Sequence, residues 1–212
     1  MFLATKTHRD HWREAYGVTT PEVVACVTAH ASIDKACDLL GIRLVKVPFD
    51  PSSFRAPVEK VKAALTANTV MIYASAPQYP HGVIDDVESL SRLALSANVG
   101  LHVDCCLGGF VLPFAQALIG DESDGSSADG SDGSGDTAAN NSKKKNPFGV
   151  PRFDFSLPGV SSMSVDTHKY GYASKGTSCV VYRSQELRRS QYFTYADCKF
   201  TRPHPSPEID LF

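Results

Sequence analysis

An α/β fold with a mostly parallel sheet is the architecture that this 212-residue sequence predicts. Short apolar segments rich in β-branched residues alternate along the chain with segments whose apolar residues recur at helical spacing. Such strands are apolar on both faces, as the buried strands of parallel sheets are. The length suits one large domain, and a hydrophobic content of 42% is sufficient for a core.

The alternation begins at residue 22. Residues 22–28 (EVVACVT) are short, β-branched and mostly apolar, which predicts a buried strand. Apolar residues recur at helical spacing over 33–40 and are followed by Gly41, a residue type that commonly ends helices. Residues 42–47 (IRLVKV) predict a second strand, which ends before Pro48.

The same alternation continues through the next sixty residues. Apolar residues on one face predict a helix over 57–67, with Pro57 in its first turn, and another over 87–97. Between and after these helices, residues 70–74 (VMIYA) and 101–106 (LHVDCC) predict buried strands. Two further short strands are expected at 160–165 and 178–182.

A low-complexity segment interrupts the pattern at 121–146. It holds six acids, three bases and no apolar residue larger than alanine, so it cannot bury enough apolar surface to offset the entropy of ordering its backbone. We expect it to be a disordered surface insertion in one domain formed by 1–120 and 147–195. Three prolines between 203 and 207 predict an irregular tail over 196–212.

Composition argues against several classes of function. The chain carries 21 Lys and Arg against 23 Asp and Glu, a net charge of −2, so we expect no nucleic-acid binding. No apolar run of about 18 residues occurs, which predicts no transmembrane segment in this chain, and the N-terminus lacks the apolar stretch of a signal peptide. The six cysteines form no CxxC pair, which argues against zinc and thioredoxin sites and favours reduced cysteines.

Polar residues at three strand ends together outline a site. In open α/β sheets, ligands bind beyond the carboxyl ends of the strands, where this sequence places His30, Asp104 and Lys169. A lysine bonds to a carbonyl cofactor as a Schiff base once its amine has lost its proton, which a neighbouring cation such as His168 favours. A cofactor with an electron-accepting pyridine ring needs a carboxylate at the ring nitrogen. The pattern therefore predicts a pyridoxal-phosphate site, with Lys169 at the aldehyde, Asp104 at the ring nitrogen and His30 on the ring face.

Each of these residues also has a purely structural interpretation. An aspartate at a strand end often caps a helix or forms an ion pair, a single histidine is often structural, and a lysine is often a solvated cation. A metal site formed by His102, Asp104 and Cys105 is disfavoured, because adjacent strand residues point to opposite faces of a sheet. We expect no metal.

Four segments resemble the sphingosine-1-phosphate lyases, in the same order along the chain. The segments are the stretch from Tyr16 through TPEVV to His30, PQYPHGVID at 77–85, HVDCCLGGF at 102–110 and DTHKYGYASKG at 166–176. A wider group of pyridoxal-phosphate-dependent decarboxylases shares the His-Lys pair. The longer run with Tyr-Gly-Tyr and Lys-Gly is characteristic of the lyases. The resemblance covers roughly residues 1–195, apart from the insertion.

The resemblance implies the incomplete large domain of a type I pyridoxal-phosphate-dependent transferase fold and a role for six residues. The implied roles are Lys169 as the Schiff-base lysine, Asp104 as the partner of the pyridinium, His30 as the residue stacked on the ring, Ser75 as a hydroxyl near the ring oxygen, His168 as a neighbour of the cofactor phosphate and Lys175 as a contact of the substrate phosphate. The implied reaction cleaves a phosphorylated sphingoid base into a fatty aldehyde and phosphoethanolamine.

The resemblance also implies features of the whole protein. It implies a homodimer at the cytosolic side of the endoplasmic reticulum membrane, whereas this stretch alone is expected to be a soluble cytoplasmic protein. Members of the family carry a phosphate-binding loop upstream of the segment that resembles residues 1–10, an N-terminal membrane anchor and a C-terminal small domain. We therefore expect this chain by itself to bind the cofactor weakly and to show little lyase activity.

Two other functions remain open on the sequence. One is an amino-acid decarboxylase of the same cofactor family, against which the Tyr170-Gly171-Tyr172 run argues. The other is a non-catalytic fragment that binds the cofactor weakly or dimerises with a full-length copy.

Overall fold

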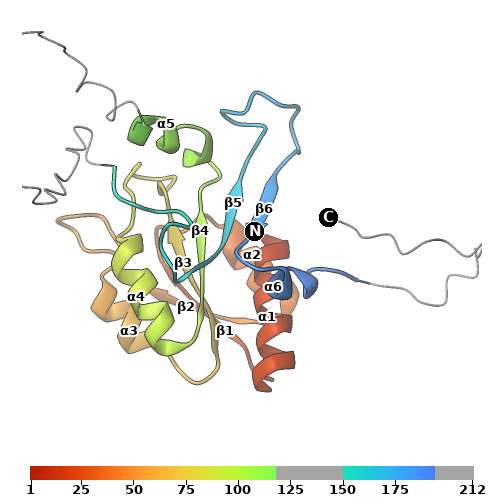
Figure 1. The fold of residues 1–212 in the computed structure, drawn as a ribbon. Coiled ribbons are helices and arrows are strands. Elements are labelled where there is room, and N and C mark those ends of the chain that lie inside the picture. Colours follow the sequence, from red (N-terminus) through yellow and green to blue (C-terminus); the bar gives the residue numbers. More distant parts are fainter. Residues whose placement is uncertain (118–149, 194–212) are drawn as a thin grey trace, which may run out of the picture.

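A computed structural model describes residues 1–117 and 150–193. Its centre is a six-stranded sheet with the order β2-β1-β3-β4-β5-β6 (Figure 1). The first five strands run parallel, and only β6 runs antiparallel to its neighbour. The strands are β1 (Glu22–Cys26), β2 (Arg43–Val47), β3 (Thr69–Ser75), β4 (Gly100–Asp104), β5 (Val160–Val165) and β6 (Cys179–Tyr182).

Helices cover both faces of the sheet (Figure 1). The helices are α1 (Phe2–Tyr16), α2 (Ser32–Leu40), α3 (Val58–Ala64), α4 (Val87–Ala97), the short 3₁₀ turn η1 (Gly108–Phe110), α5 (Leu112–Ala117) and α6 (Gln185–Arg189). The pair α3 and α4 lies on one face, while α1, α2 and α6 lie on the other. This three-layer α/β arrangement confirms the predicted fold class.

Alternation along the central strands produces two separate apolar clusters. In β1, Val24 faces the cluster that includes Leu90 of α4, whereas Val23 and Ala25 face the cluster that includes Ile33 of α2. All five residues of β1 are buried, as expected for a strand covered on both faces. The central strands are thereby held rigidly, and their carboxyl ends meet at one edge of the sheet.

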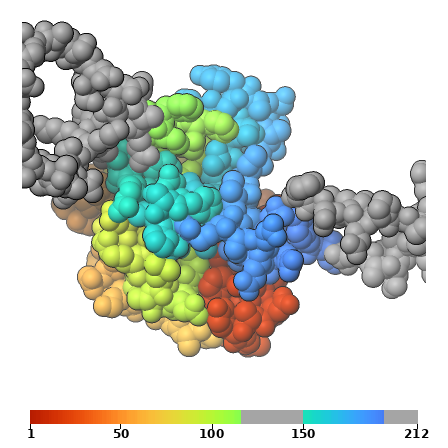
Figure 2. Space-filling view, viewed as in Figure 1, coloured from red at the N-terminus to blue at the C-terminus, as the bar shows by residue number. Residues whose placement is uncertain are grey.

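The segment after the undescribed stretch returns across α4. Arg152 donates to Glu88 at 2.7 Å, and the backbone N–H of Gly159 donates to the Ser91 hydroxyl at 2.8 Å. Figure 2 shows residues 150–160 (teal) lying over α4 (yellow-green). From there the chain enters β5 beside β4, so the residues that follow β5 arrive next to Asp104.

The predicted elements were largely correct, with shifted ends. The predicted helix over 87–97 matches α4, whose N-terminus is capped by the Asp86 carboxylate at 3.0 Å from the Ser89 N–H. The strand predicted over 22–28 ends at Cys26, and the helix predicted over 57–67 ends at Ala64. The helices α1, α5 and α6 were not predicted. The expected insertion at 121–146 and tail at 196–212 lie outside the described residues.

Among the residues that the structure describes, no helix is both long and apolar enough to span a bilayer. The five cysteines within the described ranges are free thiols.

Candidate active site

A cavity of about 210 Å³ opens at the carboxyl ends of the parallel strands, where ligands bind in folds of this type. Its walls come from the turn after β1, the end of β3, the end of β4 and the turn after β5. The lining residues are Met1, His30, Ser32, Ser75, Pro77, Tyr79, Asp104, Cys106, Leu107, Asp166 and Lys169.

The structure brings together four of the six residues that the sequence singled out. His30, Ser75, Asp104 and Lys169 all line this cavity, although the first and last are far apart in the sequence. The register of the sheet explains part of this, because Ser75 pairs with Asp104 across β3 and β4. The three strand ends therefore converge, as the sequence predicted. The roles of these residues stay predictions.

Asp104 is a buried carboxylate with several hydrogen-bond donors around it. Its Oδ1 accepts from the Cys106 N–H at 3.0 Å and from the Ser164 hydroxyl at 3.2 Å, and its Oδ2 accepts from the Tyr73 hydroxyl. Burial raises the pKa of Asp104, but the hydrogen bonds from Cys106 and Tyr73 outweigh it. The resulting pKa lies below the ordinary value, so the group is ionised at neutral pH.

A polar chain behind Asp104 fixes its orientation. Burial lowers the pKa of His102 to about 3, so its imidazole is neutral. Because Ser164 donates to Asp104, its oxygen accepts from His102 Nε2 at 3.1 Å, and His102 Nδ1 in turn accepts from Ser162 at 2.7 Å. The β5 serines thus couple Asp104 to the interior of the sheet.

Lys169 is held as a cation by a neighbouring acid. Its Nζ lies 2.9 Å from Asp166 Oδ2, and Asp166 also accepts from the Ser178 hydroxyl at 2.6 Å. Burial lowers the pKa of Lys169, but the hydrogen bond and charge of Asp166 raise it more, so the net pKa lies above the ordinary value. The expectation that a neighbouring cation at His168 would favour the neutral amine was therefore wrong, because Asp166 is the dominant neighbour.

His30 presents a defined tautomer to the cavity. Its Nδ1 accepts from the backbone N–H of Ser32 at 3.1 Å, and the Ser32 hydroxyl lies 2.9 Å from the same atom. Because a backbone N–H can only donate, Nδ1 is the acceptor in this contact and Nε2 is the ring nitrogen left to face other partners. The ring of Tyr79 meets the imidazole edge-on at 5.0 Å. The turn after β1 therefore orients a flat ring at the cavity.

Ser75 owes its place to a buried acid. Asp85 is almost fully buried and accepts from the backbone N–H groups of Ser75 at 2.9 Å and Ala56 at 3.0 Å, and from Gln78 at 3.0 Å. These bonds hold the last residue of β3 where its side chain reaches the cavity.

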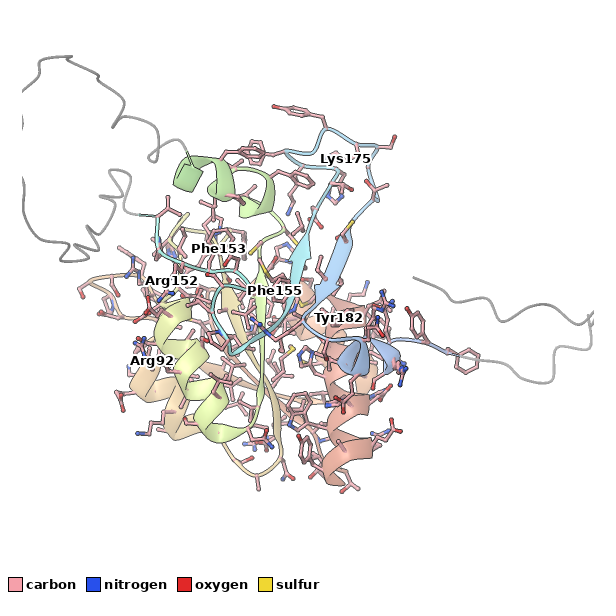
Figure 3. The ribbon with its side chains drawn as sticks, viewed as in Figure 1. Arg92, Arg152, Phe153, Phe155, Lys175 and Tyr182 are labelled. Carbon is pink, nitrogen blue, oxygen red and sulfur yellow. The ribbon has the colours of Figure 1, made fainter. Side chains whose placement is uncertain are left out.

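The other two predicted residues lie outside the cavity wall. His168 Nδ1 donates to the Thr177 carbonyl at 2.5 Å, and its Nε2 lies 3.6 Å from Asp166. Lys175 is exposed in the long loop between β5 and β6 (Figure 3). Neither residue lines the cavity as the structure describes it.

Sequence reasoning missed three residues that shape the site. Asp166 was part of a quoted motif, but its pairing with Lys169 was not foreseen. Ser164 lies in a predicted strand and gave no distinct signal. Tyr73 could have been noticed, because it has a polar tip within the apolar strand VMIYA and lies two residues before Ser75, on the same side of that strand.

Relatives of known identity match nearly the whole chain. It is 40% identical over 193 residues to a sphingosine-1-phosphate lyase of Dictyostelium discoideum, covering 91% of this chain and 31% of that protein. A sphingosine-1-phosphate lyase of Arabidopsis thaliana is 42% identical over 190 residues, or 90% of this chain and 30% of the relative. The chain thus spans about three tenths of the length of these curated relatives.

Solved structures show the same likeness. The sphingosine-1-phosphate lyase of Burkholderia pseudomallei superposes with a TM-score of 0.77 at 36% identity, covering 92% of this chain and 38% of that one. A glutamate decarboxylase of Lactobacillus brevis superposes with a TM-score of 0.67 at 22% identity over 88% of this chain and 38% of that one, which is a likeness of fold alone. A scan against models of protein families found no match.

Proposed function

Because the chain is homologous to one segment of the sphingosine-1-phosphate lyases, we propose that its protein is a pyridoxal-phosphate-dependent carbon–carbon lyase. The proposed substrate is a phosphorylated sphingoid base, and the products are a fatty aldehyde and phosphoethanolamine. The observation that carries the proposal is that Lys169 and Asp104 line one cavity at the carboxyl ends of adjacent parallel strands. An amine and an ionised carboxylate in one pocket are the two groups that this cofactor needs.

The residues of the cavity fit pyridoxal phosphate. When bound, the cofactor supplies an aldehyde that bonds to amines and a ring that accepts the electron pair of the broken bond. Lys169 would attach to the aldehyde, and Asp104, ionised and held from behind by Ser164, would keep the ring nitrogen protonated. His30 would lie against the ring face, and Ser75 would hydrogen-bond the ring oxygen.

Two further roles rest on the resemblance alone. We propose that His168 contacts the cofactor phosphate and that Lys175 contacts the substrate phosphate. Both follow β5 in the loop that leads to β6, and this loop would have to bring their side chains toward the cavity. A phosphate offers several acceptor oxygens to such cations and donors.

The ion pair with Asp166 determines how readily Lys169 loses its proton. The amine attacks a carbonyl only after it has lost a proton, and Asp166 at 2.9 Å favours the charged form. Attachment of the cofactor should therefore become easier as the pH rises.

Decarboxylation of an amino acid is the competing function with the same cofactor. The decarboxylase likeness is one of fold, at 22% identity, whereas the lyase likeness reaches 42% in sequence. The homology therefore favours the lyase. A fragment that only binds the cofactor is the third candidate, and the activity assay separates all three.

The assay offers the full chain pyridoxal phosphate and, in parallel, a phosphorylated sphingoid base, glutamate or an aromatic amino acid. We expect a fatty aldehyde and phosphoethanolamine from the lipid base, in the small amounts expected of this chain by itself, detected by mass spectrometry, and no carbon dioxide from the amino acids. Lys169→Ala should abolish the products, and Lys60→Ala on the exposed side of α3 should not. Release of carbon dioxide without aldehyde would identify a decarboxylase instead. If the chain binds the cofactor but forms neither product, it is a non-catalytic fragment that only binds the cofactor.

We further propose, from the resemblance, a homodimer and a location at the endoplasmic reticulum membrane for the whole protein. We also propose, from composition, a cofactor-binding domain of residues 1–120 and 147–195 with an insertion at 121–146 and a separate tail at 196–212. Light scattering tests the dimer, imaging of the tagged protein tests the location, and limited proteolysis tests the domain by cutting first within 121–146.

A further inference from the structure

Tyr73 is a buried tyrosine whose hydroxyl lies beside the cavity. It occupies the middle of the sheet, where its backbone pairs with Ala25 of β1 and His102 of β4. Only 2% of its surface is exposed, and its ring belongs to the apolar cluster that includes Val23 and Ile33. For packing alone, a phenylalanine would serve as well. A buried phenol needs hydrogen-bond partners, because an unpaired hydroxyl in an apolar environment is costly.

The hydroxyl finds its partners in the two residues that flank the cavity. It donates to Oδ2 of Asp104, and the backbone N–H of His30 lies near enough to lower its pKa. The hydroxyl therefore lies between the end of β4 and the turn after β1, on the intervening strand β3. The other carboxylate oxygen of Asp104 is held separately by Cys106 and Ser164.

We propose that Tyr73 is a positioning residue of the site, whose hydroxyl keeps Asp104 ionised and aimed at the cavity and couples it to the turn that carries His30. The inference rests on the proposed function, because the direction of Asp104 matters to catalysis only if a pyridine nitrogen binds there. It adds to that function a residue that contacts neither cofactor nor substrate. A hydroxyl placed between Asp104 and the turn of His30 would hold these two residues in a fixed relative position before the cofactor binds.

The charge state around the hydroxyl supports this role. Burial and the charge of Asp104 raise the pKa of Tyr73 well above its ordinary value, so the phenol keeps its proton and stays a donor. The other titratable groups that face Asp104 are the neutral His102 on its own strand, the thiols of Cys105 and Cys106 after it, and Lys169 across the cavity. None of these groups lies on β3, the strand that carries Tyr73.

The test uses Tyr73→Phe, which keeps the ring and removes the hydroxyl. Carboxyl-¹³C aspartate labelling of the full chain without cofactor allows the Asp104 signal, assigned with Asp104→Asn, to be titrated by NMR. We expect the pKa of Asp104 to be higher in Tyr73→Phe than in the unaltered chain, since one donor to the carboxylate has been lost. The matched control is Tyr182→Phe. It removes a hydroxyl that lies 2.9 Å from the Thr7 hydroxyl, in a part of the structure remote from the cavity (Figure 3). It should leave the Asp104 titration unchanged.

A purely structural role for Tyr73 would give a different result. It would lower the free energy of unfolding and leave the Asp104 titration unchanged, and that result would overturn the proposal. If Tyr73→Phe does not fold, the unaltered chain still decides the question. We expect the hydroxyl proton of Tyr73 to exchange slowly with water and its NMR signal to disappear as Asp104 becomes protonated. A freely exchanging hydroxyl proton would refute the link between Tyr73 and Asp104.

The second arm adds pyridoxal phosphate with a ¹⁵N-labelled ring. We expect Tyr73→Phe to bind it about tenfold more weakly, the effect of losing one hydrogen bond to a charged group, and to shift the ring nitrogen signal toward the unprotonated form. A shifted Asp104 titration with no cofactor binding in any variant would defeat the proposed function and keep the Tyr73–Asp104 coupling. Cofactor binding with an unchanged ring nitrogen signal would defeat the positioning role.

Discussion

Replacing Asp166 with asparagine is expected to make Lys169 react as a neutral amine at lower pH. The substitution keeps the size of the side chain and the possible bond to Ser178, and it removes the negative charge 2.9 Å from Lys169 Nζ. Without that charge the ammonium loses its main stabilising partner, while the burial that disfavours the cation remains. The pKa of Lys169 therefore falls.

The size of the effect follows from the separation of the charges. At 2.9 Å the Coulomb attraction is about 6 kcal/mol for an effective dielectric constant of about 20 and about 1.4 kcal/mol in bulk water. The Lys169 side chain is 34% exposed, so solvent screens a good part of the attraction, and about 1 to 3 kcal/mol is the expected difference. At a fixed pH near neutrality, this raises the neutral fraction of Lys169 roughly five- to 150-fold.

The assay is competitive labelling of lysines by an amine reagent across a pH series, read by peptide mass spectrometry. The labelling midpoint of Lys169 should move to lower pH in Asp166→Asn. It should stay in place in Asp38→Asn, which removes an exposed acid of α2. A midpoint that does not move in Asp166→Asn would refute the conclusion that this ion pair controls the proton on Lys169.

Two stability measurements test the packing that supports the site. Because burial lowers the pKa of His8 from 6.5 to about 4, the unfolded chain binds the extra proton in that interval. Its contribution to stability is therefore complete above pH 6.5 and is lost as the pH falls to 4, by about 1.4 kcal/mol per pH unit. In urea titrations at pH 7 and 5, His8→Gln should reduce this slope and replacement of the exposed His81 (His81→Gln) should not; an equal slope in both would contradict the assignment. Arg183 donates to three carbonyls of segment 155–160 at 2.6–2.8 Å, so Arg183→Ala should lower the free energy of unfolding by about 2 to 4 kcal/mol. Arg92→Ala, which removes an exposed pair, should change it by less than about 0.5 kcal/mol; similar losses for both would contradict the role of Arg183.

The sheet was predictable because its strands carry their own signal. In the central strands nearly every side chain is apolar and buried, so runs such as VMIYA are distinctive in the sequence. The first helix was not predictable in the same way. Its buried face consists of Ala4, Thr5, Thr7 and His8, and His8 bonds to Ser161 at 2.9 Å where an apolar helix would present leucines. A helix that packs through small and polar residues has little hydrophobic periodicity to detect.

In the site, the location of the residues was predictable from the sequence, but their hydrogen bonds were not. The rule that ligands bind at the carboxyl ends of parallel strands placed His30, Asp104 and Lys169 together before their geometry was known. The hydrogen bonds that set their charge states were not accessible to that rule. Whether Lys169 faces Asp166 or a histidine depends on side-chain directions in a turn, and the bond from Tyr73 to Asp104 crosses between strands. Such pairings depend on register and rotamer, which the sequence does not state.

The lysine that bonds to pyridoxal phosphate can be located directly, and its position tests the proposed cofactor site. The full chain is incubated with the cofactor, reduced with borohydride, digested and mapped by mass spectrometry. We expect a reduced adduct on Lys169, lost in Lys169→Ala and kept in Lys175→Ala. An adduct mainly on Lys175 or another lysine, with Lys169 unmodified, would show that the cavity between Asp104 and Asp166 is not the cofactor site.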